Sequence, residues 1–490
     1  MRVEICRGRG LVWQAAAMNT PTLTTLSTIN ADGSRKFVHP ADVQGRFTRW
    51  RQWSALLLLV IYVALPWIPV NGFPAVFLDV QTRRFHFFGL TLAAQDLWVG
   101  FFLITGLAFA LFFVTSLFGR VWCGWTCPYT VFLEHVYRRI ERWIDGDAAA
   151  RRRLEKAPWR GGKIARRVFK HVLFLLVSAL IAHVFLSYFV SIRGLYAMMQ
   201  RSPQEHALAF GVVVFLTGSL YFSFSWFREQ FCIILCPYGR LQSALTDDHS
   251  VVIGYDKRRG EPRGKAGTTS GDCVDCRRCV QVCPTGIDIR QGLQLECIGC
   301  AACVDACDDI MLKLKRPTGL VRYDSHAGLH GGRTKLVRAR TVFYSAILLA
   351  GAAAFLFAAA RIEPLRASVV RMVGAPYYVA DGVVRNQFLV RVINKRNAPS
   401  TYRLELTGAV PPGLQVTGAE QELRLEAMGE EQKTLVLSLP EAGFTGPFKL
   451  QVKVTETASG ASMTTRVMEF LGPDPRLKSN VPLNPRDFVQ

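Results

Sequence analysis

The chain reads Cys273-Val-Asp-Cys276-Arg-Arg-Cys279-Val-Gln-Val-Cys283-Pro284 and, shortly afterwards, Cys297-Ile-Gly-Cys300-Ala-Ala-Cys303-Val-Asp-Ala-Cys307. Both stretches space four cysteines as C-x2-C-x2-C-x3-C. Three thiolates two residues apart wrap one face of an iron–sulfur cube, and the fourth reaches the neighbouring cluster. The spacing therefore predicts two [4Fe-4S] clusters, one held by Cys273, Cys276, Cys279 and Cys307, and the other by Cys297, Cys300, Cys303 and Cys283.

Two other interpretations of these quartets stay open. Four-cysteine zinc sites normally use two C-x2-C knuckles instead of closely spaced triplets, so zinc is disfavoured. A purely structural role for the clusters is the second alternative, although two cubes this close are typical of a relay for single electrons. Asp308 follows Cys307 where the usual bacterial pattern has proline. This difference removes no ligand, and we expect it to alter the local turn and the exposure of that cluster.

Outside this block the chain is strongly apolar. It has 490 residues, 50% hydrophobic and 20% charged, and a mean hydropathy of +0.19. A helix needs about 17–25 apolar residues to cross ~30 Å of hydrocarbon. Five runs reach that length, at 54–70, 97–118, 168–192, 207–227 and 342–360. The first is the weakest, because Pro66, Pro69 and Pro74 break its far end, and no apolar signal-peptide core precedes it.

The Lys and Arg residues between these runs predict the topology. The segments alternate between rich and poor, with 8 in 1–53, 2 in 71–96, 12 in 119–167, 2 in 193–206 and 18 in 228–341. By the positive-inside rule the three rich segments are cytoplasmic, and an odd number of spans puts residues 361–490 outside. The net charge of +22 is thereby assigned to loops that face anionic lipid, and we expect no nucleic-acid partner.

The C-terminal part changes to an alternation of apolar and polar residues. From about residue 375 this period of two appears in runs such as Phe388–Ile393 and Phe448–Val454, separated by Gly, Pro and Asn. It predicts an antiparallel sandwich of about seven short strands. The sandwich has no cysteine and no clustered His, Asp or Glu, so docking or assembly is its expected role.

The predicted fold class is a membrane α-helical protein with about five transmembrane helices, an inserted α+β dicluster ferredoxin domain and a C-terminal all-β sandwich. The expected domains are a cytoplasmic segment 1–53, four transmembrane helices in 54–227 with a basic loop 119–167, a cytoplasmic ferredoxin domain 228–341, a fifth transmembrane helix 342–360 and an outer domain 361–490.

A second cysteine pattern repeats at the inner ends of two spans. The chain has 13 cysteines; twelve fall in the two quartets and in two pairs, and Cys6 stands alone. The pairs read Trp122-Cys123-Gly-Trp-Thr-Cys127-Pro128-Tyr129 and Phe231-Cys232-Ile-Ile-Leu-Cys236-Pro237-Tyr238. Spacing of i to i+4 puts the sulfurs of each pair on one face if the backbone is helical.

The chemistry of thiols suggests what these pairs do. Soft thiolates favour Cu(I), and a dithiol also exchanges electrons with a metal or a disulfide. We therefore expect a metal-reducing or metal-holding site that faces the ferredoxin segment, formed by Cys123, Cys127, Cys232 and Cys236. The plain alternative is that buried membrane cysteines are small hydrophobic residues.

Other residues with ligand chemistry lie near these segments. His135, His171 and His183 are further candidate ligands, but a bis-histidine haem is disfavoured because the other histidines lie mostly in loops or near membrane ends. Met198 and Met199 offer thioethers in an outer loop, and ordinary packing is the favoured interpretation. The basic stretch 255–271 is expected to be a flexible connector that meets lipid phosphate or docks an electron donor.

With its motifs in this order, the chain resembles the family of cytochrome c oxidase accessory proteins called CcoG, FixG or RdxA. The resemblance covers nearly the whole chain after about residue 30 and is most specific in Gly119–Pro128, Arg228–Pro237, Arg259–Arg263 and Cys273–Cys307. It implies a multi-pass protein of the bacterial inner membrane, with a cytoplasmic ferredoxin domain and a periplasmic immunoglobulin-like domain. It also implies a cupric reductase that makes Cu(I) for assembly of cbb3-type oxidases.

On this resemblance the four cysteines of the pairs would bind and reduce copper, while the eight ferredoxin cysteines carry electrons to them. The implied partners are oxidase assembly factors, a copper transporter or chaperone, a cytoplasmic electron donor and membrane lipid. Two alternatives stay open: a quinol-linked membrane ferredoxin relay for a periplasmic reductase, and a non-catalytic copper-holding assembly scaffold. The outer sandwich and the absence of an evident haem ligand set disfavour the relay.

Overall fold

A computed structural model describes residues 36–93, 96–264, 271–361, 365–396, 398–419 and 422–473. Cys6, Met18 as an alternative start, and residues 265–270 of the expected connector lie outside the described residues. The chain divides into two compact units, which we call the helical unit (Met1–Ile68 and Gly100–Ala354) and the sandwich unit (Pro69–Val99 and Phe355–Gln490).

Four helices among the described residues are long and apolar enough to cross a membrane. They are Trp98–Phe118 within α2 (Leu97–Phe118), α7 (Gly161–Leu186), the stretch Ala207–Phe227 that starts with α9 (Ala207–Phe222), and α15 (Ala339–Ala360). They agree with four of the five expected runs, except that α7 starts earlier than residue 168 and ends before residue 192. The chain is therefore a membrane protein.

The first expected span, 54–70, is shifted in the structure. α1 covers Arg46–Ala64 and a short 3-10 turn follows it. The early start has a physical cause, because the Asp305 carboxylate accepts hydrogen bonds from the amides of Phe47 at 3.2 Å and Thr48 at 2.7 Å. These are amides that the first turn of a helix leaves unpaired. Pro66, in the turn that follows, explains why the helix stops where it does.

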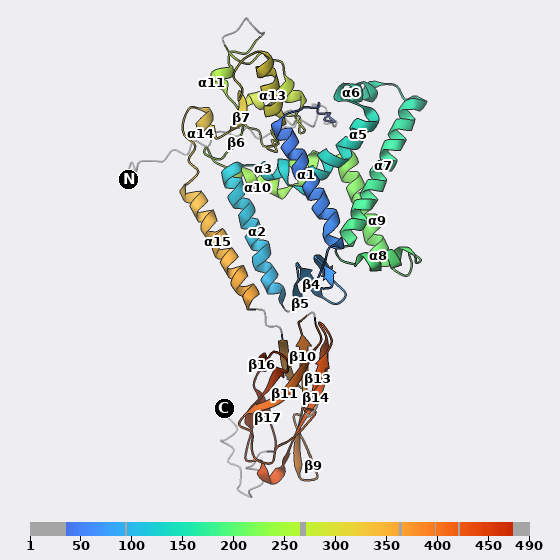
Figure 1. The fold of residues 1–490 in the computed structure, drawn as a ribbon, viewed down its shortest axis with the longest axis vertical. Coiled ribbons are helices and arrows are strands. Elements are labelled where there is room, and N and C mark those ends of the chain that lie inside the picture. Colours follow the sequence, from blue (N-terminus) through green and yellow to red (C-terminus); the bar gives the residue numbers. More distant parts are fainter. Residues whose placement is uncertain are drawn as a thin grey trace, which may run out of the picture. The chain divides into compact units, whose positions relative to one another are not determined.

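α1 is not one of the four apolar helices, since arginines occupy its first turns. Its C-terminal end nevertheless meets the C-terminal part of α7, and the two helices diverge from there (Figure 1). Tyr62 near its end donates a hydrogen bond to the Ile181 carbonyl at 2.9 Å, and Tyr188 donates to the Tyr62 carbonyl at 2.7 Å. α1 therefore extends from the segment that carries the cysteine quartets to the C-terminal part of α7.

Short helices follow α2 and α9 and carry the two cysteine pairs. Each second cysteine comes directly before a proline that begins a new helix, which is a favoured place for proline. Three π-helical turns interrupt this region, and such turns are frequent at functional sites. The short helical elements of the helical unit that lie between its long helices, together with α10, are α3 (Val121–Trp125), α4 (Pro128–Phe132), η3 (Leu133–Tyr137), α5 (Arg138–Asp145), α6 (Ala148–Lys156), α8 (Ile192–Met199), η4 (Ser223–Phe227), η5 (Phe231–Leu235) and α10 (Pro237–Leu245). The π-helical turns are η3, η4 and η5.

The cysteine quartets belong to a small module inserted between α10 and α15. Strands β6 (Val252–Tyr255) and β7 (Val321–Asp324) pair antiparallel, and helices α12 (Arg278–Gln281) and α13 (Ala302–Lys313) pack together beside them. Two further short helices are α11 (Lys257–Gly260) and α14 (His326–Leu329). This is the α+β module that the sequence predicts, and we call it the ferredoxin module.

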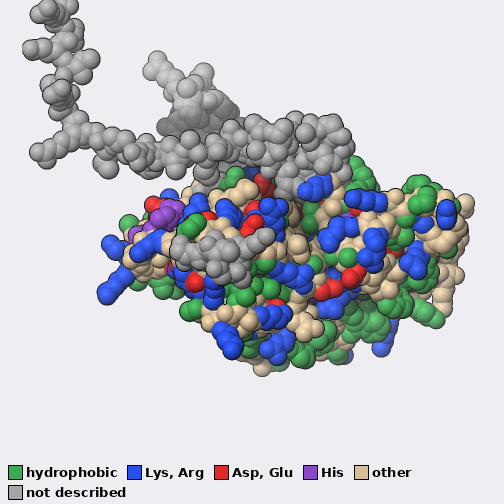
Figure 2. Space-filling model, turned by 90° about the horizontal axis from the view of Figure 1, so that it is seen from above, with side chains coloured by type: hydrophobic (Ala, Val, Ile, Leu, Met, Phe, Trp, Pro, Cys, Tyr) green, Lys and Arg blue, Asp and Glu red, His purple; other side chains and the backbone are tan. Residues whose placement is uncertain are grey.

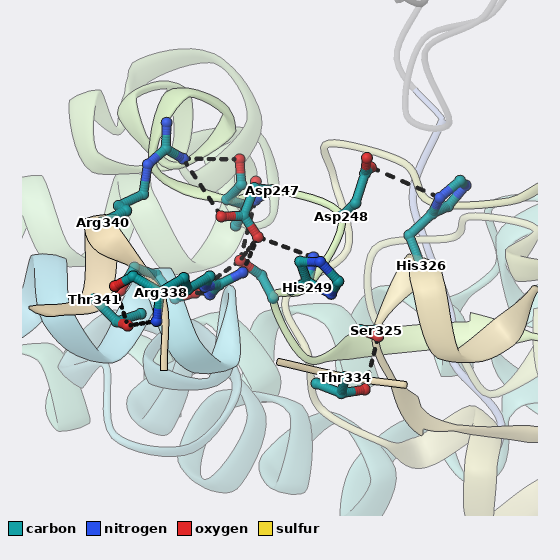
Figure 3. Close-up of polar contacts among 12 residues, drawn as sticks. Asp247, Asp248, His249, Ser325, His326, Thr334, Arg338, Arg340 and Thr341 are labelled. Atoms are coloured by element: carbon teal, nitrogen blue, oxygen red, sulfur yellow. Dashed lines mark hydrogen bonds and ion pairs between the residues drawn. The ribbon is translucent and has the colours of Figure 1, made fainter. Parts of the chain in front are cut away.

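Asp247 fixes the place where the ferredoxin module rejoins the membrane helices (Figure 3). This residue follows α10, and its carboxylate pairs with Arg338 and Arg340 at the start of α15. Arg338 also donates a hydrogen bond to the Ser116 carbonyl near the end of α2, at 2.5 Å. The side chain of Asp247 therefore links three elements on the side of the helices that carries the module.

A network of buried ion pairs lies between α5, α7 and the break between η4 and η5. Arg228 donates to both carboxylate oxygens of Glu141, at 3.1 and 2.9 Å, and Lys170 donates to Asp145 at 2.6 Å. All four side chains are buried. Burial alone would raise the pKa of Glu141, but the charges of Arg228 and Lys170 lower it to about 2.

The sandwich unit contains two antiparallel sheets of five strands each, counted over the described residues. One has the order β12-β14-β10-β8 with β9 beside β10, and the other β13-β11-β15-β16 with β17 beside β15. Buried residues such as Val384, Phe388, Tyr402 and Phe470 fill the space between the sheets. The expected all-β sandwich is confirmed. It starts earlier than residue 375, with the first strand at Leu365–Arg371.

Four strands of the sandwich, β10, β11, β14 and β15, have 9 to 12 residues, and five others have only three. The bounds are β8 (Leu365–Arg371), β9 (Tyr378–Ala380), β10 (Val383–Asn394), β11 (Ser400–Gly408), β12 (Gln415–Thr417), β13 (Leu423–Leu425), β14 (Glu430–Pro440), β15 (Phe448–Glu456), β16 (Ser462–Thr464) and β17 (Met468–Phe470). Between α1 and α2 the chain also forms small sheets that the sequence analysis treats as a loop, with strands β1 (Pro69–Val70), β2 (Phe73–Pro74), β3 (Val76–Asp79), β4 (Arg84–Phe87) and β5 (Leu90–Ala93).

Replacing Glu141 by Gln tests the buried network. The Glu141→Gln change leaves Arg228 and Lys170 without their shared carboxylate, and breaking a buried pair in this way costs about 3–5 kcal/mol. We expect a lower melting temperature in detergent. Because the folded-state pKa lies below the ordinary 4.5, the contribution of Glu141 is complete above about pH 4.5 and is lost as the pH falls toward 2.

The matched control is Glu205→Gln, which removes the exposed Arg201–Glu205 pair. Exposed pairs contribute about 0–1 kcal/mol, so this variant should melt close to the parent. Equal melting temperatures for both variants would contradict the role given to the network.

Candidate functional site

The eight ferredoxin cysteines line two cavities. One cavity is bordered by Cys273, Cys276, Cys279 and Cys307. The other is bordered by Cys283, Cys297, Cys300 and Cys303, with Cys279 at its edge. We call them the first and the second cluster cavity. The structure brings the cysteines together in the two groups that the spacing predicts, each with its fourth cysteine taken from the other motif.

The two motifs share one backbone conformation. In the first motif, Asp275 and Arg277 flank Cys276 with φ of 48° and 54°. In the second, Gly299 and Ala301 flank Cys300 with φ of 66° and 59°. Left-handed residues of this kind turn successive backbone N–H groups to one side, which forms a concavity suited to an anionic iron–sulfur group. Three of the four residues are not glycine, and they adopt this conformation at a cost of about 1–3 kcal/mol each.

The residues around the cavities fit a [4Fe-4S] group. Burial raises the pKa of Cys279, Cys297 and Cys307 to about 12, and neighbouring thiolates add to the shift. Burial likewise places the pKa of Cys303 well above its ordinary value. Sulfurs gathered around one cavity repel one another as thiolates, and bound cations such as the irons of a cluster would stabilise that ionised form.

Asp308 takes the place of the proline that usually follows the last cysteine. α13 continues through it to Lys313, whereas α12 ends shortly before Cys283 and Pro284. The Asp308 carboxylate accepts a hydrogen bond from the Gly319 amide at 2.9 Å. Asp308 is also one of the charges that raise the pKa of Cys307, after burial and Cys279. The first cluster cavity therefore has a fixed negative charge beside one ligand.

The membrane cysteine pairs do not lie on one continuous helix face, which corrects the expectation from their spacing. Cys127 and Cys236 are extended, with ψ of 122° and 111°, and each ends a helical turn. The cause is the proline that follows, since a residue before proline is driven out of the helical region. The first cysteine of each pair does lie in a helical turn, Cys123 in α3 and Cys232 in η5.

The two pairs nevertheless lie near each other. Burial raises the pKa of the Cys232 thiol to about 12, and the charges of Cys127, Cys123 and Cys236 add to the shift. Cys123 is buried, and Gln242 of α10 donates a hydrogen bond to its sulfur at 3.7 Å. The segment after α2 and the segment after α9 thus bring their sulfurs to one region of the helical unit.

The first pair packs directly against the second cluster cavity. A Cβ atom on Gly124 would lie 2.6 Å from the Ile298 carbonyl oxygen and 2.9 Å from the Cys300 Cα. Cys123 shares one buried apolar cluster with Ile298 and Cys300. The Trp125 indole also donates a hydrogen bond to the Gly299 carbonyl at 3.3 Å. Only a glycine fits at this contact, so the pair and the second motif form one packed assembly.

The three candidate histidines have other surroundings. Burial and the charge of Arg51 lower the pKa of His135 to about 4. The His171 Nδ1 atom lies 3.0 Å from the Tyr221 hydroxyl, and the His183 Nδ1 atom lies 2.7 Å from the Ala179 carbonyl. Within the described ranges, no three His, Cys, Asp or Glu side chains stand close enough to share a single metal ion.

Sequence reasoning missed Arg138. This guanidinium is fully buried and donates hydrogen bonds to Glu229 at 3.0 Å and to the Pro284 carbonyl at 3.1 Å, directly after Cys283. It therefore supports the end of the first motif, where Cys283 borders the second cluster cavity. In the sequence it counts as one of many loop arginines. The spacing of Glu134, Arg138 and Glu141 could have identified Arg138. Residues three or four positions apart share a helix face, so two acids lie beside this arginine.

Family models match three parts of the chain. Residues 227–326 match a 4Fe-4S dicluster domain, and residues 99–147 match a 4Fe-4S binding domain. Residues 355–473 match an IG-like fold at the C-terminal of FixG. The first two matches cover the quartets and also both cysteine pairs.

Curated relatives match most of the chain. Protein RdxA of Cereibacter sphaeroides is 35% identical over 395 residues, which cover 76% of this chain and 82% of RdxA. Nitrogen fixation protein FixG of Rhizobium meliloti is 34% identical over 433 residues, or 78% of this chain and 82% of FixG. Protein RdxB of C. sphaeroides is 33% identical over 425 residues, or 82% and 87%. The chain therefore belongs to the FixG/RdxA family and is a membrane-associated iron–sulfur electron-transfer protein.

Proposed function

We propose that this protein is a cupric reductase, in which electrons delivered to the ferredoxin module reduce Cu(II) held by the membrane cysteine pairs. The observation that carries the proposal is the contact of Gly124 with Ile298 and Cys300, which puts the first pair against the second cluster cavity. Bound [4Fe-4S] clusters accept and release single electrons. Each Cu(II) ion needs one electron to become Cu(I), so the two processes match.

The residues of the chain have separate tasks in this proposal. Cys273, Cys276, Cys279 and Cys307 would hold one [4Fe-4S] group, and Cys283, Cys297, Cys300 and Cys303 would hold another beside the pairs. Both groups would supply one-electron redox chemistry. Copper is the substrate and binds to thiolates from the set Cys123, Cys127, Cys232 and Cys236, because soft thiolates prefer Cu(I) and so favour the reduced ion. Gln242 positions Cys123 by its hydrogen bond to the sulfur.

The proposal places the ferredoxin module in the cytoplasm and the sandwich in the periplasm of a bacterial inner membrane. Figure 2 supports it, because Lys and Arg side chains are spread over much of the face that carries the module. Short basic loops stay on the cytoplasmic side. A cytoplasmic donor then supplies the electrons, and the Cu(I) product serves cbb3-type oxidase assembly through a copper transporter or chaperone and assembly factors.

Removing the four thiols of the pairs tests the proposal. The quadruple serine variant combines Cys123→Ser, Cys127→Ser, Cys232→Ser and Cys236→Ser. We expect the reduced, cluster-loaded parent protein in detergent to convert Cu(II) to Cu(I), and the variant to lose at least about 90% of that rate, because serine oxygen is a poor ligand for Cu(I). The measurement is anaerobic formation of the Cu(I)–bathocuproine complex with loss of the Cu(II) EPR signal.

The matched control is Cys6→Ser, which removes the one cysteine outside both patterns and should leave the rate unchanged. Iron and sulfide content is measured on every sample, so that a lost cluster is not mistaken for a lost copper site. An unchanged rate in the quadruple serine variant at full cluster content would remove the pairs from the mechanism. A further cluster bound by the pairs would show as about four extra irons in the parent compared with this variant.

Asp308 provides a test of the electron route. Its negative charge beside Cys307 opposes reduction of the first cluster, since a potential depends on net charge and hydrogen bonds around the sulfurs. Asp308→Asn should therefore raise that cluster's potential, on the order of tens of millivolts, while the second cluster changes less. The measurement is an EPR-monitored redox titration.

Asp309→Asn is the control, because Asp309 is exposed and pairs with Lys313 at 2.6 Å. Its charge faces solvent and is screened, so we expect little change in either potential. Equal shifts of the reduction potentials in the two variants, or a shift confined to the second cluster, would contradict the position of the Asp308 charge beside the first cluster cavity.

A further inference from the structure

A cavity of about 260 Å³ lies at the end of α7 and α9 that is remote from the ferredoxin module. At 1.5 Å per residue, the 26 residues of α7 span about 39 Å. Lys163 at its start donates hydrogen bonds to the Glu155 carbonyl of α6 and to the Ala157 carbonyl after it. α8 lies at the other end of α7 (Figure 1), and residues of both helices line the cavity. The cavity is therefore separate from the cysteine pairs.

Three elements contribute ligand chemistry to this cavity. His183 comes from the last turn of α7, Met198 and Met199 end α8, and His206 directly precedes α9. These are two of the nine histidines and two of the nine methionines of the chain. Their meeting in one cavity depends on the folded connection between α7 and α9, which the sequence pattern alone does not reveal.

The histidines are prepared for coordination. The Ala179 carbonyl can only accept a hydrogen bond, so the His183 Nδ1 atom at 2.7 Å carries the hydrogen and Nε2 keeps its lone pair. Donation of the second ring N–H to a carbonyl is the usual support of a metal-binding imidazole. His206 is the residue before α9, and its side chain makes no capping hydrogen bond there. Both imidazoles are half-buried.

The donor set selects the kind of ion. Among the described residues that line the cavity there is no carboxylate, and the one charged side chain is the cation Arg201. Hard divalent cations need several oxygen ligands, which this lining does not offer. Thioethers select Cu(I), and imidazole also suits copper.

Ordinary packing of apolar side chains explains only some of the residues that line the cavity. Leu186 is buried in its wall as expected for a helix end. Met199, however, leaves 64% of its surface exposed, so it is not a core residue that fills space. Acyl chains would fit the aliphatic wall but would give the two imidazoles no partner.

We infer that this cavity binds a soft monovalent cation, Cu(I), through His183, Met198, Met199 and His206. We call it the Met–His site. It goes beyond the proposed reductase activity, because binding here needs no electron from the clusters and no cysteine. It gives the chain a second copper site, on the side of the helical layer opposite the first.

The test supplies Cu(I) directly to the full-length, cluster-loaded quadruple serine variant in detergent, buffered with bathocuproine disulfonate. The quadruple serine variant lacks the competing thiols of the pairs. Because Cu(I) is supplied directly, the result does not depend on whether the protein reduces copper. We expect one Cu(I) per chain, with sulfur and nitrogen neighbours in the X-ray absorption spectrum. Adding Met198→Leu and Met199→Leu, which nearly conserve volume, should weaken binding by at least about tenfold and remove the sulfur signal.

A second change, His183→Gln, should weaken Cu(I) binding to a similar degree and keep the sulfur signal. Matched controls are Met372→Leu and His330→Gln, which lie outside the cavity and should bind like the parent. Cluster absorbance on each sample verifies that the protein is folded. Absence of Cu(I) from the parent background, or equal affinity in the cavity variants and the controls, would overturn the Met–His site. Cu(I) binding to the quadruple serine variant without sulfur neighbours in the X-ray absorption spectrum would also overturn it.

Discussion

The close approach of Gly124 to Ile298 and Cys300 is the constraint on which the rest of the functional unit depends. A side chain at this position would meet the backbone of the second cysteine motif at less than 3 Å. Because the residue is a glycine, a segment that leaves a membrane helix touches the loop that binds a cluster. Without this contact, the quartets and the pairs would be two unrelated cysteine sites.

Buried charge surrounds this contact and gives it a fixed geometry. Arg138 reaches the Pro284 carbonyl, and Arg51 donates a hydrogen bond to the Gly124 carbonyl at 2.9 Å. Buried cations are costly unless acids accompany them; Glu229 pairs with Arg138, and Glu141 pairs with the neighbouring Arg228. The basic residues of this region thus have two roles, since some face solvent while others hold the cysteine segments in place.

Much of the architecture could be predicted because its causes are local. The grouping of the eight cysteines follows from a spacing of a few residues, and the sandwich follows from alternation along single strands. The start of α1 could not be predicted, because its free amides are paired by Asp305, a residue far away in sequence. The pairs were found by their repeat, but the bend before Pro128 and Pro237 removes the common helix face. Arg138 and the Met–His cavity also depend on tertiary contacts.

The central claim is that eight cysteines hold two clusters while four others remain available for copper. Iron, acid-labile sulfide, zinc and copper quantified on anaerobically purified full-length protein, together with EPR of the reduced state, test it most directly. The account predicts about eight irons and eight sulfides per chain and a spectrum of two interacting [4Fe-4S] clusters. Zinc in place of iron, or about twelve irons per chain, would contradict it.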